Sequence, residues 1–183
     1  MATRKTHTAK PSSWKKVLLY LLPVGLLIMG GLAYMTNAAT DPNALSSTDK
    51  AFLLETAEIR MMDWAEGNLA VDRGSVAYQQ YGKRVMHDQE KMMKALRELA
   101  SAKKLELPEK LDTERAEDLI YLKASKGEWF DRRFRRMIIQ DIKHDIRSFE
   151  SAAESEDTEV RSFAKHYLPM LEKHLQLARD LNR

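Results

Sequence analysis

Apolar residues recur every three or four positions along residues 127–150, and this helical period constrains the fold more than any other feature. The stripe comprises Phe130, Phe134, Ile138, Ile142, Ile146 and Phe149. Residues spaced in this way share one face of an α-helix, so the pattern predicts a helix with one buried side. Asp141 and Asp145 fall beside the stripe. Because a buried carboxylate is costly unless it is paired, hydrogen-bonded or bound to metal, we expect Asp141 to need a partner.

Three further segments show the same period. Helices are predicted over residues 48–71, 75–103 and 159–181, in addition to 127–153. Pro108 interrupts the second connection, because proline removes a backbone donor and clashes inside a helix. A shorter helix over residues 112–124 then spans the rest of that connection. No β-rich run or glycine-rich phosphate loop occurs. The sequence therefore predicts an all-α four-helix bundle with a short extra helix between its second and third helices.

A separate segment precedes the predicted bundle. Residues 1–16 are polar and basic, and residues 17–35 form nineteen positions without a charge. A helix of this length spans about 29 Å, close to the hydrocarbon thickness of a bilayer. Positive charge only on its N-terminal side predicts a cytoplasmic tail and an exported domain. We therefore divide the chain into a basic tail (1–16), a transmembrane anchor or signal segment (17–35), a linker (36–47) and a helical domain (48–183).

Two fates of the apolar segment remain open. Small residues at 36–39 would suit cleavage by a signal peptidase, which would release the domain to the periplasm. The length of the segment and its sixteen-residue tail instead suit a retained single-pass anchor with the domain outside the cytoplasm. The chain has no cysteine, so it offers no disulfide, thiolate metal site or cysteine nucleophile.

Charge argues against a nucleic-acid partner. Five of the 30 basic residues and none of the 27 acidic ones lie in residues 1–39, so the remainder carries a slight acidic excess. Nucleic-acid binding calls for a basic face. The segment RRFRR at 132–136 is a local basic cluster, but ERAED at 114–118 and ESED at 154–157 oppose a uniformly basic surface.

Polar residues interrupt the apolar line of every long helix. The candidate metal ligands are Asp63, Glu66, Asp88, Asp141 and His174. Bundle cores that bind metal use inward carboxylates and histidines from facing helices, which makes iron or manganese the alternative to having no cofactor. The pattern departs from a di-iron site, because Glu-x-x-His is missing and Asp141-x-x-His144 occurs on one helix only. The competing interpretation is that these carboxylates pair with Arg or Lys.

Two weaker hypotheses concern other residues. His166, Met170 and His174 follow one another every fourth position, a spacing that would suit Cu(I), although methionine also fills irregular cores. A ligand pocket lined by Trp64, Tyr81 and Phe134 could open where Pro169 kinks the last helix. No nucleophile and base stand at a recognisable spacing, so no hydrolase activity is predicted.

Several short motifs follow one another in a specific order. They are Gly67-x-Leu69-Ala70, Met86-x-Asp88, Leu107-Pro108, Gly127-x-x-Phe130-Asp131, Met137-x-x-x-Asp141 and Leu168-Pro169-x-Leu171-x-x-His174-Leu175-x-x-Ala178. In this order they resemble the exported bacterial family known as domain of unknown function 4142. The resemblance covers residues 49–181 and implies a ferritin-like four-helix fold in the bacterial envelope, with a link to stress by association.

The resemblance also implies a pattern of polar residues. The family has an acidic residue in helix one, Asp-His pairs in helices two and three, and a histidine in helix four. Asp63, Asp88, Asp141 and His174 match that pattern, but Gln89 and Ile142 replace the paired histidines. Any family metal site is therefore expected to be degraded here. We expect a non-catalytic, membrane-tethered bundle with a binding or structural role, and a metal-binding bundle is the alternative.

Overall fold

The computed structural model describes residues 44–181, which form five helices and no strand. These are α2 (Ser47–Arg73), α3 (Val76–Ala102), α4 (Thr113–Ala124), α5 (Gly127–Ala152) and α6 (Thr158–Asp180). The five predicted helices are confirmed, and helix α6 continues through Pro169 as expected. The predicted tail, membrane segment and most of the linker lie outside the described residues. Within the described part of the chain, no helix is both long and apolar enough to cross a membrane.

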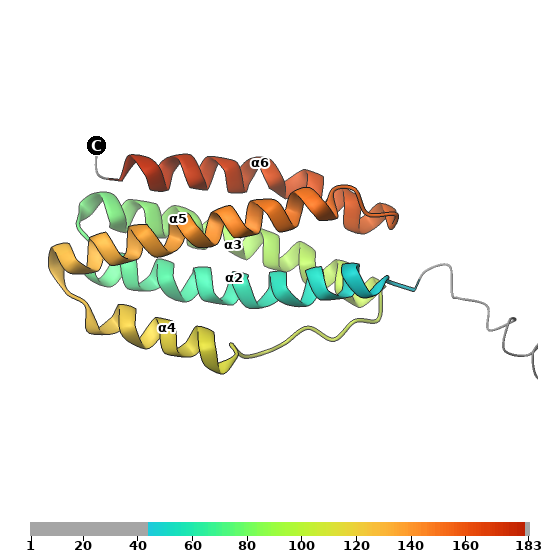
Figure 1. The fold of residues 1–183 in the computed structure, drawn as a ribbon, viewed down its shortest axis with the longest axis horizontal. Helices are drawn as coiled ribbons and strands as arrows, with labels where there is room; N and C mark the ends of the chain where they lie inside the picture. The colour runs from blue at the N-terminus through green and yellow to red at the C-terminus, as the bar shows by residue number, and fades with distance from the viewer. Residues whose placement is uncertain (1–43, 182–183) are drawn as a thin grey trace, which may run out of the picture. The chain divides into compact units, whose positions relative to one another are not determined.

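The four long helices pack as two antiparallel hairpins. Helix α2 pairs with α3 and α5 pairs with α6, while further contacts join α2 to α5 and α3 to α6 (Figure 1). Helix α4 lies against α2 and α5 and connects the two hairpins on the outside of the bundle. This arrangement places the end of α2, the end of α4 and the start of α5 together.

Glycines allow the first hairpin to pack with close backbones. A Cβ atom built on Gly82 would lie 2.5 Å from the carbonyl oxygen of Gly67, and one on Gly67 would lie 2.8 Å from Met86 Cγ. Because the neighbour of Gly82 is a backbone atom, this position requires glycine, whereas a side chain at Gly67 would require Met86 to move. The start of α5 has a different requirement, because Gly127 has a φ of 54°, which residues with a side chain rarely adopt.

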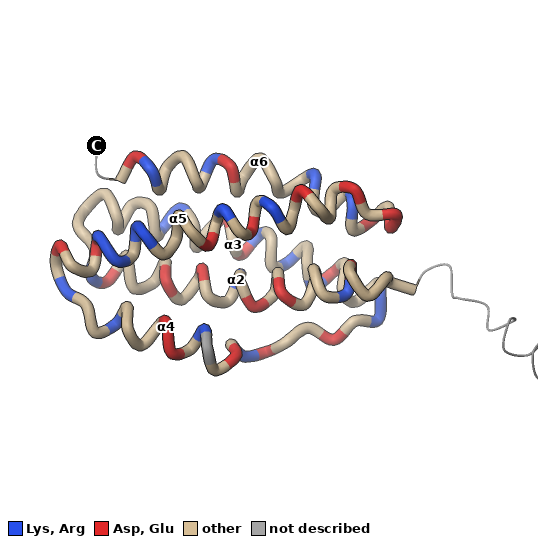
Figure 2. The backbone as a smooth tube through the Cα atoms, viewed as in Figure 1, with Lys and Arg blue, Asp and Glu red and all other residues tan. Residues whose placement is uncertain are grey.

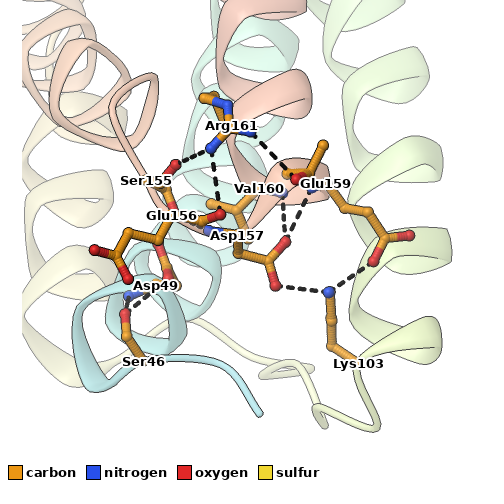
Figure 3. Close-up of polar contacts among 10 residues, drawn as sticks. Ser46, Asp49, Lys103, Ser155, Glu156, Asp157, Glu159, Val160 and Arg161 are labelled. Carbon is orange, nitrogen blue, oxygen red and sulfur yellow. Dashed lines mark hydrogen bonds and ion pairs between the residues drawn. The ribbon is translucent and has the colours of Figure 1, made fainter. Parts of the chain in front are cut away.

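Side-chain caps fix the ends of several helices. Asp157 accepts hydrogen bonds from the backbone N–H groups of Glu159 (3.0 Å) and Val160 (3.1 Å), which α6 would otherwise leave unpaired (Figure 3). The other carboxylate oxygen of Asp157 lies 2.6 Å from Lys103 Nζ, just beyond the end of α3. Ser46 caps α2 through the N–H of Asp49 in the same way. These contacts tie the end of α3 to the start of α6.

The apolar core is divided into two clusters along the bundle. One cluster contains Phe52, Leu53, Met92, Leu96, Phe149 and Phe163, near the start of α2. The other contains Tyr78, Tyr81, Leu122, Phe130, Phe134 and Ile138, near the α4–α5 connection. Along each long helix, buried polar residues fall between the members of the two clusters. A polar layer therefore crosses the middle of the bundle.

Candidate functional site

Arg60 on α2 is the centre of this polar layer. Its side chain is fully buried and forms an ion pair with Asp145 of α5. Its guanidinium also lies 3.2 Å from Asp63 Oδ2, one helical turn along α2, and donates to Met92 Sδ of α3 at 3.4 Å. The positive charge is thus shared by two carboxylates on different helices. Burial would lower the pKa of Arg60, but Asp145 and Asp63 outweigh it and raise the pKa above its usual value.

Two residues of α3 extend the layer. Gln89 Nε2 donates a hydrogen bond to Asp63 Oδ2 at 2.8 Å. Asp88 Oδ2 lies 3.0 Å from His174 Nε2 of α6 and accepts from Arg84 Nε at 2.7 Å. Every long helix therefore contributes at least one polar side chain to the layer.

The Asp88–His174 pair differs from the rest of the layer in its protonation. Burial lowers the pKa of His174 despite the hydrogen bond to Asp88, so the imidazole favours its neutral form. Burial would raise the pKa of Asp88, but hydrogen bonds from His174 and Arg84 outweigh it and lower that pKa. A neutral imidazole that donates from Nε2 to an ionised carboxylate satisfies both groups.

Glu66 forms no ion pair among the described residues. The residue is 1% exposed, and its Oε1 atom has no hydrogen-bond partner among the described residues. It lines a small internal cavity together with Asp63, Tyr81, Gln89 and His174. The centre of a water molecule can occupy a volume of about 10 Å³ in this cavity. The cavity therefore has room for about one water. A water that donates to Glu66 Oε1 and Gln89 Oε1 would satisfy both unpaired oxygens.

Three carboxylates in or near the layer, Asp63, Glu66 and Asp141, have raised pKa values. Burial raises the pKa of Asp63 to about 7, against the opposing effect of Arg60. Burial also raises the pKa of Glu66 well above its usual value, and the charges of Asp63 and Asp141 add to the effect. The pKa of Asp141 rises to about 6, mainly through burial, although Arg115 of α4 opposes the rise. Because the layer holds more carboxylates than cations, part of this group stays protonated near neutral pH.

The predicted ligands are only partly brought together. Asp63, Glu66 and His174 line the same cavity, and Asp88 contacts His174. Asp141, expected to be the carboxylate next to the core, lies half-buried at the edge of the layer, whereas Asp145 is 2% exposed. Both residues were expected beside the stripe, and the structure places Asp145 rather than Asp141 in the core. Residues four apart lie on nearly the same helix face, so the apolar stripe does not decide between them.

Pairing of the carboxylates with Arg or Lys was expected at the bundle surface, but the buried position of Arg60 was missed by sequence reasoning. Arg60 follows Ile59 and lies three positions before Asp63, so it borders the predicted inward line of α2. Arginine is rarely buried without a partner, and the separation of three from Asp63 was the available signal. The partner on α5 could not be identified, because its position depends on the stagger of two helices that are distant in sequence.

The side chains present do not fit a metal centre. Among the described residues, no three His, Asp or Glu side chains converge as a metal site requires. Arg60 already engages Asp63 and Asp145, and Gln89 presents its amide donor rather than an acceptor. Ile142 joins the second apolar cluster.

The weaker hypotheses also concern residues that the structure separates. His87 and His144 are exposed, as is His166, whereas His174 is buried in the core. Of the two histidines in the copper hypothesis, His166 therefore lies on the surface and His174 lies in the core. Tyr81 and Phe134 line the internal cavity, whereas Trp64 lines a separate groove between α2 and α3.

The fold and the polar layer together define the class of protein. It is an all-α helical bundle in which a buried arginine pairs with core carboxylates. Residues 34–181 match the family described as Domain of unknown function (DUF4142). The chain belongs to this family, which confirms the resemblance in the sequence. No curated protein and no solved structure matches it.

Removal of the central cation tests the layer. We expect Arg60→Met to destabilise the bundle by about 3–5 kcal/mol, since it leaves Asp145 and Asp63 buried without a cation. The double variant Arg60→Met/Asp145→Asn should recover a large part of this loss. Urea unfolding of residues 43–183, a compact unit that contains both core clusters, measures the free energy. A single variant as stable as wild type would show that Arg60 does not hold the layer together.

The raised pKa of Glu66 predicts that the stability of the bundle depends on pH. Because the folded pKa lies above the unfolded value, the native state binds more protons, and stability falls as pH rises above about 4.5. Glu66→Gln removes this titration. We expect the variant to match wild type near pH 5 and to become the more stable protein by pH 8, as measured by urea unfolding at both values. Glu58→Gln on the same helix is the control, and parallel curves for wild type and Glu66→Gln would contradict the expectation.

Proposed function

We propose that this chain is a non-catalytic envelope protein, a ferritin-like helical bundle that residues 17–35 tether to the bacterial membrane, with a binding or structural role. The observation that carries the proposal is the buried Arg60 between Asp63 and Asp145. In a metal-binding bundle, core carboxylates balance the charge of the ion. Here a guanidinium supplies the positive charge at that level of the bundle, so the carboxylates serve packing.

The core of the described helices has little free space. The cavity beside Glu66 has room for about one water molecule, far less than the several hundred Å³ of a small-molecule site. The larger hollows among the described residues open on the surface, for example the groove of about 420 Å³ beside Trp64. A binding role would therefore use the outer surface of the helices.

The envelope location rests on the N-terminal sequence. Residues 17–35 are uncharged, and all charged residues that precede them are basic. This pattern favours a cytoplasmic N-terminus and an exported bundle. Retained anchorage is the preferred form of the proposal, and release after cleavage near residues 36–39 is its alternative. Both forms place the bundle outside the cytoplasm.

The absence of cysteine makes this topology directly testable. Single cysteines are introduced in the full chain as Ser12→Cys in the tail and Ser151→Cys on the exposed surface of α5. With a membrane-impermeant maleimide on intact spheroplasts, we expect S151C to react at once and S12C only after lysis. The opposite pattern would overturn the proposal. A shortened chain released from the membrane would instead establish cleavage.

Metal titration separates this proposal from the metal-binding alternative. The full chain is purified without chelator and titrated anaerobically with Fe(II), Mn(II), Zn(II) and Cu(I), followed by elemental analysis. We expect no near-stoichiometric metal, and no change in trace binding for Asp141→Ala or His174→Ala. His144→Ala, at an exposed histidine, is the control. Near-stoichiometric metal that is lost in the first two variants and kept in the control would establish the alternative.

A further inference from the structure

The most exposed apolar side chains gather at the end of the bundle where α4 leads into α5. Ile120 and Tyr121 near the end of α4 are 62% and 60% exposed, and Trp129 in the first turn of α5 is 74% exposed. Val76 at the start of α3, which begins beside this end, is 70% exposed. Scattered single apolar residues on a surface are ordinary. Here four of the six large apolar side chains that are exposed among the described residues lie at one end of the bundle, and two of them are aromatic. A concentration of this kind is typical of a binding surface.

Basic side chains surround these aromatic rings. The Arg132 guanidinium lies over the Trp129 ring at 4.5 Å, and the Arg133 guanidinium lies over the Tyr121 ring at 5.8 Å. Trp129 and these arginines, with Arg136 and Ser125, line an open surface hollow of about 510 Å³. Glu128 pairs with Arg132 at 3.1 Å and neutralises part of the charge. We call this surface the basic aromatic end; its members are Ile120, Tyr121, Lys123, Lys126, Trp129, Arg132, Arg133 and Arg136.

The opposite end of the bundle lacks such a basic cluster, and its acidic side chains are partly paired with Lys103. The turn between α5 and α6 and the start of α6 contain Glu154, Glu156, Asp157 and Glu159, whereas basic residues gather in the first turns of α5 (Figure 2). Helix α2 begins at the acidic end and runs towards the basic aromatic end over 27 residues, which is about 40 Å of helix. A negatively charged surface would therefore attract the end with the basic residues of α5 more strongly than the opposite end.

We propose that the basic aromatic end docks on the surface of an anionic phospholipid bilayer. Trp and Tyr side chains favour the level of the lipid headgroups, where the ring is buried and its polar atom stays wet. Lys and Arg side chains near an anionic leaflet are attracted to its negative surface potential. Exposed Ile120 and Trp129 supply apolar contact, and Arg132, Arg133 and Arg136 supply phosphate contacts.

Apolar side chains distinguish a bilayer from a soluble polyanion. A soluble anionic polymer would be held by the basic residues alone, and its binding would not depend on Ile120. A bilayer surface has both an anionic layer and an apolar layer beneath it, which matches the two kinds of side chain present. The combination of exposed aliphatic, aromatic and guanidinium groups thus favours lipid over a soluble polyanion.

Co-flotation tests the proposal with the full chain. The protein is reconstituted in nanodiscs of neutral phosphatidylcholine, which accommodate the predicted membrane segment, and is mixed with vesicles that contain phosphatidylglycerol. We expect the loaded nanodiscs to float with these vesicles and not with pure phosphatidylcholine vesicles. Arg132→Glu/Arg136→Glu should reduce binding about tenfold or more. Lys91→Glu/Lys94→Glu, which makes the same charge change at exposed sites on α3, should reduce it much less.

A second variant separates lipid from polyanion binding. Ile120→Ser/Tyr121→Ser/Trp129→Ser keeps every charge, and we expect it to lose most of the flotation; circular dichroism confirms that each variant is folded. Flotation equal to wild type in this variant would overturn the proposal in favour of charge-only binding to anionic polymers. Equal losses in the R132E/R136E and K91E/K94E variants would overturn it as well, because attraction would then follow net charge rather than this surface.

Discussion

The ion pair of Arg60 with Asp145 and Asp63 is the contact on which the rest of the bundle depends. A guanidinium in an apolar core is expensive to desolvate, and its partners recover that cost only in good geometry. Here the partners come from α2 and α5, with Met92 of α3 on a third side. A shift of α2 or α5 by a turn would separate Arg60 from Asp145 and leave a buried charge unpaired. The layer therefore fixes the stagger of the helices, which the apolar clusters on either side would leave less well defined.

The balance of charge in the layer explains its other members. Burial is the main cause of the raised pKa values of Asp63 and Glu66, and one arginine cannot neutralise Asp145, Asp63 and Glu66 together. Helix α4 supplies a second cation, because Arg115 lies 3.6 Å from Glu58 and opposes the rise in the pKa of Asp141. This helix was expected only to span a connection. Through Arg115 it also supplies positive charge near acidic side chains of α2 and α5. Its Leu122 is buried in the second apolar cluster.

Local signals in the sequence were sufficient for the helices but not for the contacts between them. The predicted bounds of all five helices agree with the structure to within about two residues. They follow from the apolar period, from Pro108 and from the capping residues, because these signals act within one turn of the chain. The choice between Asp141 and Asp145 failed because each borders the same stripe. Arg60 was overlooked because its partner Asp145 lies 85 residues away. Such a pair is set by packing of whole helices, which no local pattern records.

The two departures from the family pattern make sense beside Arg60. At position 89 a glutamine donates to Asp63, whereas a metal-ligating histidine would offer a lone pair. At position 142 an isoleucine enlarges the apolar cluster beside the layer. Each position lacks the histidine that the resemblance implies, and Gln89 adds a donor for a carboxylate. A bundle whose core provides its own cation and its own donors can keep its helices in register without an ion, which leaves its outer surface as the part available for interaction.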